Sequence, residues 1–159
     1  FARFPTPESL AYADLEEVER IIHRTGFYHA KARHITGAAR ALVERFDGTV
    51  PSTMEELLTI PGVGRKTANI VLNHSFGIDE GIAVDTHVRR LAQRIGFSDS
   101  ANPDKIEQDL MVIFPRSHWG GITYLLIRHG REVCPARKPQ CGACVIRDLC
   151  RFVCLQEER

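Results

Sequence analysis

Apolar side chains along this chain recur mostly with the period of an α-helix. Residues three, four and seven positions apart lie on one side of a helix, so a stripe of this kind marks the face that packs against a core. No segment alternates apolar and polar residues strictly enough to predict a strand. The pattern therefore predicts an all-α fold of about seven helices. Its stripes are Leu15, Val18 and Ile22; Ile35, Ala39, Leu42 and Phe46; Val88, Leu91, Ala92 and Ile95; and Ile106, Leu110, Ile113 and Phe114.

Glycine and proline separate these stripes, and both residues commonly end helices. The predicted breaks are Gly26, Asp47-Gly48, Pro61-Gly62, Gly77, Gly96, Pro115 and Gly120-Gly121. A chain of 159 residues suffices for one compact unit or for two small lobes. No apolar run approaches the ~20 residues of a membrane helix, so no membrane partner is expected.

The charge distribution carries more information than the net charge of +1. The segment 116–151 holds seven Lys or Arg against two acids, whereas residues 1–60 hold nine acids against seven bases. A basic end on a nearly neutral chain is expected when one face contacts phosphate. An ordinary solvated surface explains the same distribution equally well.

Four cysteines near the end of the chain follow the spacing Cys134-x6-Cys141-x2-Cys144-x5-Cys150. Thiols grouped in this way favour a metal site over disulfides in an intracellular chain. Zinc and iron–sulfur clusters both accept four thiolates, so the spacing leaves these two alternatives open. Cys154 is interpreted as a spare thiol and not as a ligand.

A short apolar helix in the segment 53–76 runs into Pro61-Gly62-Val63-Gly64, and a second helix begins at Arg65. The glycines allow a tight turn and the close approach of another backbone. The start of the second helix, with Arg65 and Lys66, favours an anion and can hold a DNA phosphate without reading its sequence. A plain helix–turn–helix packing element is the alternative.

Three blocks in one order carry a specific resemblance. Ile60-Pro-Gly-Val-Gly-Arg-Lys-Thr-Ala-Asn69, then Ala83-Val-Asp-Thr-His-Val88, then the cysteine spacing resemble the endonuclease III family of helix-hairpin-helix DNA glycosylases. The segment Thr25-Gly-Phe-Tyr-His-Ala-Lys-Ala32 also matches a block of that family. The resemblance implies two helical lobes with a DNA-binding cleft between them. It divides the chain into a hairpin-bearing barrel lobe, 1–80, and a C-terminal lobe, 81–159, with a [4Fe–4S] cluster loop at 134–150.

The resemblance implies a bifunctional DNA glycosylase and AP lyase of base excision repair, with Lys66 and Asp85 as its catalytic residues. Lys66 stands where the family carries the lysine that attacks the sugar and forms a Schiff base, and enzymes that only remove the base carry another residue there. Asp85 stands at the position of the essential aspartate, where a carboxylate stabilises a sugar cation. The alternatives are a phosphate-contacting lysine and an N-cap for the helix that begins at Thr86.

The same resemblance implies double-stranded DNA with a damaged base or an abasic site as the partner, and Cys134, Cys141, Cys144 and Cys150 as the cluster ligands. Phe27 stands where the family places a wedge that helps to unstack the target base, although a core position is the commoner fate of phenylalanine. The remaining residues expected to contact DNA are Gly62, Val63, Gly64, Arg65 and His87.

Several features of substrate and assembly are expectations from the family alone. Oxidised pyrimidines are its usual substrates, and a mismatch or adenine glycosylase on the same scaffold or a non-enzymatic DNA-binding module are the alternatives. The family has a further segment upstream of the position of Phe1, so we expect Ile122, Leu125 and Leu126 to need apolar partners from it. A monomer when complete, in the cytoplasm with the nucleoid or in the nucleus, is expected.

Overall fold

The computed structural model of the chain describes residues 2–153, and every regular element in that range is helical. The all-α prediction is confirmed, with eight α-helices in this part of the chain where the stripes predict about seven. None of them is long and apolar enough to cross a membrane. They are α1 (Pro7–Ala11), α2 (Leu15–Ile22), α3 (Tyr28–Phe46), α4 (Met54–Leu58), α5 (Arg65–Phe76), α6 (Thr86–Ile95), α7 (Pro103–Ile113) and α8 (Trp119–Glu132), with short 3-10 turns η1 (Arg116–His118), η2 (Cys141–Ala143) and η3 (Arg147–Leu149).

The chain divides into two compact units, which we call unit 1 (Phe1–Ala68) and unit 2 (Asn69–Arg159). The division falls inside α5, so the first turn of this helix belongs to unit 1 and the rest of it to unit 2. The division that the family resemblance implies lies after residue 80, beyond the end of the same helix.

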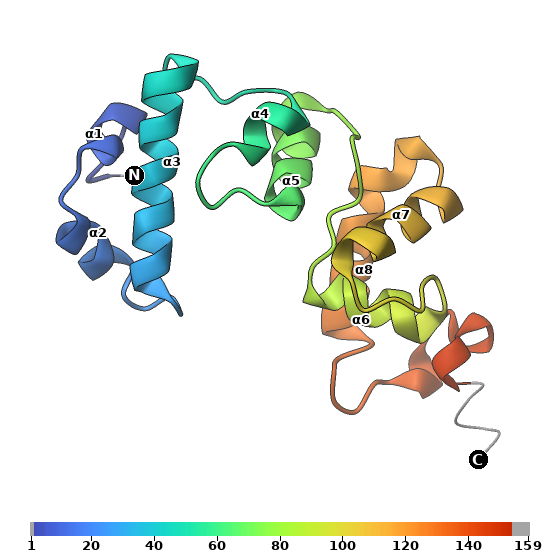
Figure 1. Cartoon of the computed structure of the whole chain (residues 1–159). Coiled ribbons are helices and arrows are strands. Elements are labelled where there is room, and N and C mark those ends of the chain that lie inside the picture. The colour runs from blue at the N-terminus through green and yellow to red at the C-terminus, as the bar shows by residue number, and fades with distance from the viewer. Residues whose placement is uncertain (1, 154–159) are drawn as a thin grey trace. The chain divides into compact units, whose positions relative to one another are not determined.

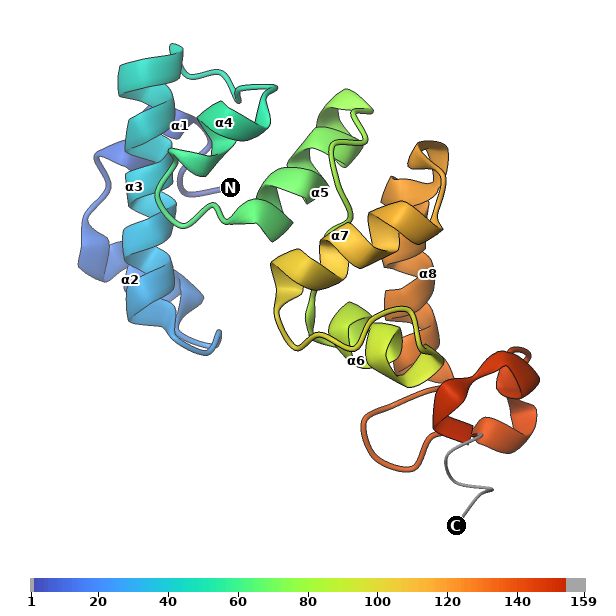
Figure 2. The ribbon, with the colours of Figure 1, turned by 45° about the vertical axis from the view of Figure 1, so that its right-hand side comes forward.

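Unit 1 is built on the long helix α3, and Figures 1 and 2 show α1 and α2 packed against it. Its buried positions are mostly small, because Ala11 of α1 and Ala32, Ala39 and Ala41 of α3 fill the contact and allow the helices to approach closely. Side chains fix where the short helices begin. Thr6 caps α1 through the amide of Ser9, and the helix α2 is capped by Asp14.

Unit 2 has a larger apolar core, which α6, α7 and α8 form together with the extended segment before α6. Ile82 and Val84 of that segment are buried, so the chain enters α6 through the core. Burial of large aliphatic side chains supplies most of the favourable free energy here, at roughly 25 cal/mol per Å² of apolar surface. The remaining buried members of this core are Val88, Leu91, Ala92, Ile106, Leu110 and Leu126.

The apolar stripes predicted for α6 and α7 are confirmed, except at the C-terminal end of α7. Val88, Leu91 and Ala92 of α6 are buried. Ile106 and Leu110 of α7 are also buried, but Ile113 is 46% exposed. It is the last residue of α7, and the chain turns away at Phe114 before Pro115, so the helical stripe no longer applies there.

Candidate functional site

The turn between α4 and α5 is fixed by backbone sterics. Gly62 has φ +78°, a left-handed conformation that strongly favours glycine. A Cβ atom at Gly62 would lie 2.6 Å from Cβ of His34 on α3, so the absence of a side chain lets the turn rest on that helix. Gly37, one turn further along α3, lies under Pro61. The predicted tight turn is therefore confirmed, and the group that approaches it closely is the side chain of His34.

Lys66 lies in the first turn of α5, directly after this turn, and its side chain is exposed. The first intrahelical hydrogen bond of α5 runs from the amide of Ala68 to the carbonyl of Gly64. Gly64 is thus the N-terminal boundary of the helix, and the partial positive charge of a helix N-terminus lies at Arg65 and Lys66. This arrangement suits an anion such as a phosphate.

Asp85 also stands at the N-terminus of a helix, where a buried extended segment leads into α6. Its Oδ1 accepts hydrogen bonds from the amides of His87 and Val88, both at 2.8 Å. The N-cap alternative for Asp85 is therefore confirmed. The cap uses only one carboxylate oxygen, and the carboxylate is held firmly because Val84, just before it, is buried.

His87 and Arg90 lie on the side of α6 that contacts α8. Arg90 Nη2 lies 3.2 Å from His87 Nδ1 and donates to the carbonyls of Gly130 at 2.9 Å and Cys134 at 3.1 Å. Gly130 leaves room for both side chains. The His87 ring thus takes part in packing within unit 2, and its contact with DNA stays a prediction.

Phe27 is 90% exposed, so the alternative that it belongs to the core is wrong. It occupies the N-cap position of α3 with φ 58°, a left-handed conformation that is uncommon for a bulky residue. A strained backbone that presents an aromatic ring to solvent is typical of functional positions more than of packing.

Cys134, Cys141, Cys144 and Cys150 are free thiols that line one small cavity in unit 2. Leu91 and other apolar side chains complete its wall together with Arg94, His129 and Gln140. Four thiols around one small cavity are the donor set that a [4Fe–4S] cluster takes, so the residues present fit that group. Cys154 lies outside the described residues.

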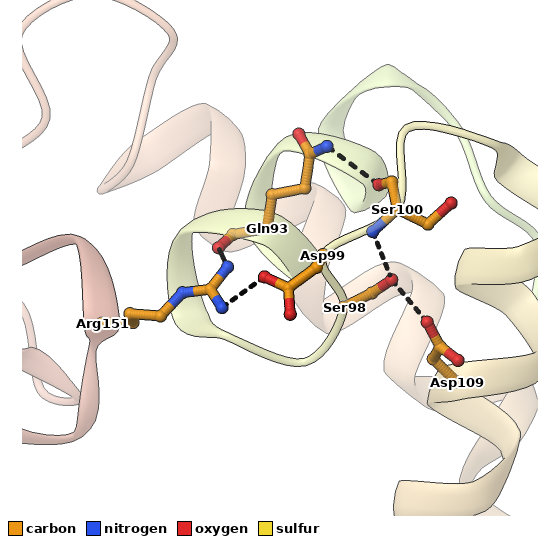
Figure 3. Close-up of polar contacts among 6 residues, drawn as sticks. All are labelled: Gln93, Ser98, Asp99, Ser100, Asp109 and Arg151. Atoms are coloured by element: carbon orange, nitrogen blue, oxygen red, sulfur yellow. Dashed lines mark hydrogen bonds and ion pairs between the residues drawn. The ribbon is translucent and has the colours of Figure 1, made fainter.

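Two arginines that the sequence analysis did not single out hold this cysteine loop to the end of α6. Arg94 donates to Cys134 Sγ at 3.2 Å and to the carbonyls of Pro135 and Ala136, both at 2.9 Å. Arg151, next to Cys150, pairs with Asp99 at 2.5 Å and donates to the carbonyl of Gln93 at 3.0 Å (Figure 3). These partners are 40 to 58 residues apart, and no local pattern indicates them.

A buried polar pair one turn after Lys66 was also missed. Asn69 of α5 donates through Nδ2 to Glu107 Oε1 of α7 at 2.8 Å, and both side chains are buried. Gly81 lies so close to this pair that any side chain there would overlap it. Buried polar groups normally need hydrogen-bond partners. This bond therefore ties α5 to α7 and the core of unit 2.

The basic end of the chain is partly neutralised within unit 2. Arg128 pairs with Glu132 in α8, and Arg151 pairs with Asp99. Arg116 donates to the carbonyl of Asp79 and lies 3.8 Å from a carboxylate oxygen of Glu80. Some of the basic side chains that could contact phosphate are therefore paired with carboxylates of unit 2.

Two family models match the chain. The model of the HhH-GPD superfamily base excision DNA repair protein covers residues 1–116. The iron–sulfur binding domain of endonuclease III covers residues 134–150, the range of the four cysteines.

Individual proteins give the same match. An endonuclease III of Synechocystis sp. is 54% identical over 150 residues, which are 94% of this chain and 68% of that protein. A solved non-covalent endonuclease III–DNA complex matches with a TM-score of 0.92 and 38% identity, over 100% of this chain and 74% of that one. A trapped endonuclease III–DNA covalent intermediate, an estranged-adenine complex, matches with a TM-score of 0.92 and 39% identity over the same shares.

Proposed function

The chain belongs to the endonuclease III family, DNA glycosylases with AP lyase activity in base excision repair that carry a [4Fe–4S] cluster, and on that premise we propose that Lys66 is its nucleophile and Asp85 its essential carboxylate. The observation that carries the proposal is the placement of Lys66 in the exposed first turn of α5, directly after the glycine turn. The structural relative trapped as a covalent intermediate with DNA supports a covalent step.

In the proposed reaction the Lys66 amine attacks C1′ of the damaged nucleotide. The C1′–N bond breaks, and the base leaves with the bonding electrons and takes up a proton. The sugar ring opens to give a Schiff base on Lys66, and loss of a C2′ proton then expels the 3′ phosphate by β-elimination. This sequence accounts for base removal and strand cleavage by one residue.

Asp85 is proposed to oppose the positive charge that develops on the sugar as the base leaves. Its carboxylate is well suited to this role because its cap bonds at Oδ1 fix its orientation in advance. The other oxygen is not used by the cap and can face the sugar or move protons.

The proposed partner is double-stranded DNA with a damaged base or an abasic site. The hairpin residues Gly62, Val63, Gly64 and Arg65 would hold a phosphate through the start of α5, without reading the sequence. Phe27 would enter the stack beside the target base, because its ring is exposed and a flipped base leaves a gap to be filled. His87 is proposed as a further DNA contact.

Cys134, Cys141, Cys144 and Cys150 are the proposed ligands of the [4Fe–4S] cluster, since all four line one cavity. When bound, the cluster cross-links the loop that follows α8 and can exchange an electron. We further propose that oxidised pyrimidines are the preferred lesions, that the enzyme acts as a monomer, and that it works in the compartment that holds the DNA.

Single-turnover assays on matched duplexes test this proposal. The duplexes would carry an oxidised pyrimidine, an abasic site, a mismatched thymine or a mismatched adenine. We expect base removal and strand cleavage at the oxidised pyrimidine, and neither from Lys66→Ala, which should still bind the duplex. Preference for a mismatched base would assign the chain to mismatch or adenine repair, and binding without base removal by the unmodified chain would make it a DNA-binding module.

A further inference from the structure

Arg94 is the one described side chain in the wall of the cysteine cavity that both carries a permanent positive charge and donates a hydrogen bond to a cysteine sulfur. Its Nη1 lies 3.2 Å from Cys134 Sγ. An arginine remains protonated in proteins, so this contact brings a full positive charge to the sulfur.

The guanidinium is held in place by neutral groups. Its two terminal nitrogens donate to the carbonyls of Pro135 and Ala136, both at 2.9 Å, and its plane lies over the ring of Phe152 with 4.8 Å to the centroid. None of these contacts is a carboxylate. The positive charge is therefore not balanced by the groups that orient it, and it acts on the cysteine sulfurs.

The last turn of α6 also reaches the other end of the cysteine loop. The carbonyl oxygen of Arg94 lies 3.4 Å from Cys150 Sγ and accepts its hydrogen while Cys150 is a free thiol. Arg151 closes over the same turn, with Asp99 and the carbonyl of Gln93 as its partners (Figure 3). The first and last cysteines thus both lie beside one helical turn, and the Arg94 side chain donates to the first of them.

We propose that Arg94 is a positioning residue for the cluster, and that it holds the sulfur of Cys134 and raises the reduction potential of the bound cluster. The proposal rests on the four cysteines being the ligands, as proposed above. Hydrogen bonds to the sulfurs and the net charge nearby are two of the factors that set cluster potentials. A cation stabilises the more negative, reduced form more than the oxidised one, so it raises the potential.

The experiment is a redox titration of the iron-loaded chain, followed by its visible absorption and electron paramagnetic resonance, without DNA. Arg94→Gln removes the charge, and Arg94→Lys keeps the charge but loses the planar fork that reaches the sulfur and two carbonyls. Arg128→Gln is the matched control, because it removes the same charge from an exposed pair on α8.

We expect Arg94→Gln to lower the potential by an amount that corresponds to about a tenfold change in the equilibrium constant, which is 59 mV for a one-electron couple. Arg94→Lys should fall between it and the unmodified chain, and both variants should lose iron to a chelator faster than Arg128→Gln. A potential of Arg94→Gln equal to that of the control would overturn the proposal. If Arg94→Gln retains no iron, the test passes to Arg94→Lys, where an unchanged potential overturns it.

A different result identifies failure of the underlying ligand assignment. If the unmodified chain contains stoichiometric zinc or no iron–sulfur absorption, the proposed cluster ligation fails before Arg94 is tested. Normal iron content with an unchanged potential in the Arg94 variants leaves the ligand assignment intact and removes only the role of Arg94.

Discussion

The turn between α4 and α5 and the cysteine loop after α8 both hold an irregular backbone in a defined shape, but by different means. The turn relies on sterics: Gly62 adopts a left-handed conformation against His34, and Gly37 makes room for Pro61. The cysteine loop relies on polar contacts between residues far apart in the sequence, above all those of Arg94 and Arg151.

The two regions also differ in how much apolar surface they bury. Ile60, at the entrance of the turn, is buried. In the cysteine loop, Val145 is 94% exposed and Leu149 is 80% exposed. A loop that buries so little apolar surface gains little from the hydrophobic effect, so its shape depends on hydrogen bonds and on the cluster. The turn should therefore tolerate loss of the cluster, whereas the loop should not.

The largest expected effect follows removal of one cluster ligand. Replacing Cys134, Cys141, Cys144 or Cys150 by Ser should abolish stoichiometric iron and lower the melting temperature by roughly 10 °C, about 3 kcal/mol for a chain of this size. Cys154→Ser is the control and should retain iron and stability. Iron analysis and thermal melting measure both effects. A Cys144→Ser protein that has lost its iron but melts at an unchanged temperature would show that the loop does not depend on the cluster.

Asp85→Asn tests the N-terminus of α6, the end opposite Arg94, where the backbone is fixed by the Asp85 side chain. Asparagine is also a good N-cap, so the melting temperature should change little. The negative charge is lost, and base removal should slow by ~10²-fold or more. Single-turnover kinetics and a melting curve on the same sample separate the catalytic role of Asp85 from its capping role. A large loss of stability with unchanged activity per folded molecule would reduce Asp85 to a cap.

Gly62→Ala tests the steric account of the turn. The left-handed backbone and the overlap with His34 should together cost about 2 kcal/mol of unfolding free energy. Gly64→Ala is the matched control, because a Cβ atom there meets open space. Adding His34→Ala should recover only a small part of the loss, because it removes Cγ and Nδ1 of His34 but keeps the Cβ atom that lies 2.6 Å away, and it leaves the backbone strain unchanged. Equal stability of Gly62→Ala and Gly64→Ala by urea unfolding would contradict this account.

The smallest expected effect is a change in stability at acidic pH, and it involves the loop between α6 and α7, which Arg151 also contacts. Ser98 donates to Asp109 at 2.6 Å and, with Lys105, holds the pKa of that carboxyl below its ordinary value of 3.8. A lowered folded-state pKa stabilises the fold above the unfolded-state pKa, and this contribution is lost as the pH falls through the folded value.

Ser98→Ala removes the larger cause, so the pKa of Asp109 should rise toward its ordinary value. The variant should then begin to lose stability at a slightly higher pH on acidification. Lys105→Ala should raise the pKa less. Carboxyl-carbon NMR titration reports the pKa directly, and an unchanged value in Ser98→Ala would assign the shift to other groups.

Much of the fold and part of the site could be predicted from the sequence. The helical stripes at Val88 and Leu91, the tight turn at Gly62 and the cap at Asp85 depend on residues within a few positions of one another, where propensity and sterics decide. The left-handed conformation of Phe27 could not be predicted, because nothing local requires it.

The contacts of the cysteine loop could not be predicted either. Arg94 and Arg151 lie among other polar residues that fit a solvated helix face equally well, and only the folded chain brings them to Cys134 and Asp99. The buried pair of Asn69 and Glu107 joins residues 38 positions apart in the same way. Long-range polar contacts of this kind leave no periodic signal in one sequence.

The covalent attachment of the chain to DNA tests the central claim most directly. The 159-residue chain would be incubated with a duplex that carries an abasic site, reduced with borohydride, and digested for peptide mass spectrometry. The reduced sugar should be found on Lys66 and not on Lys31, Lys105, Lys138 or the terminal amine. Lys66→Ala should give no adduct, while Lys105→Ala should give the same amount as the unmodified chain. An adduct on any other amine, or equal trapping by Lys66→Ala, would contradict the assignment of Lys66 as the nucleophile.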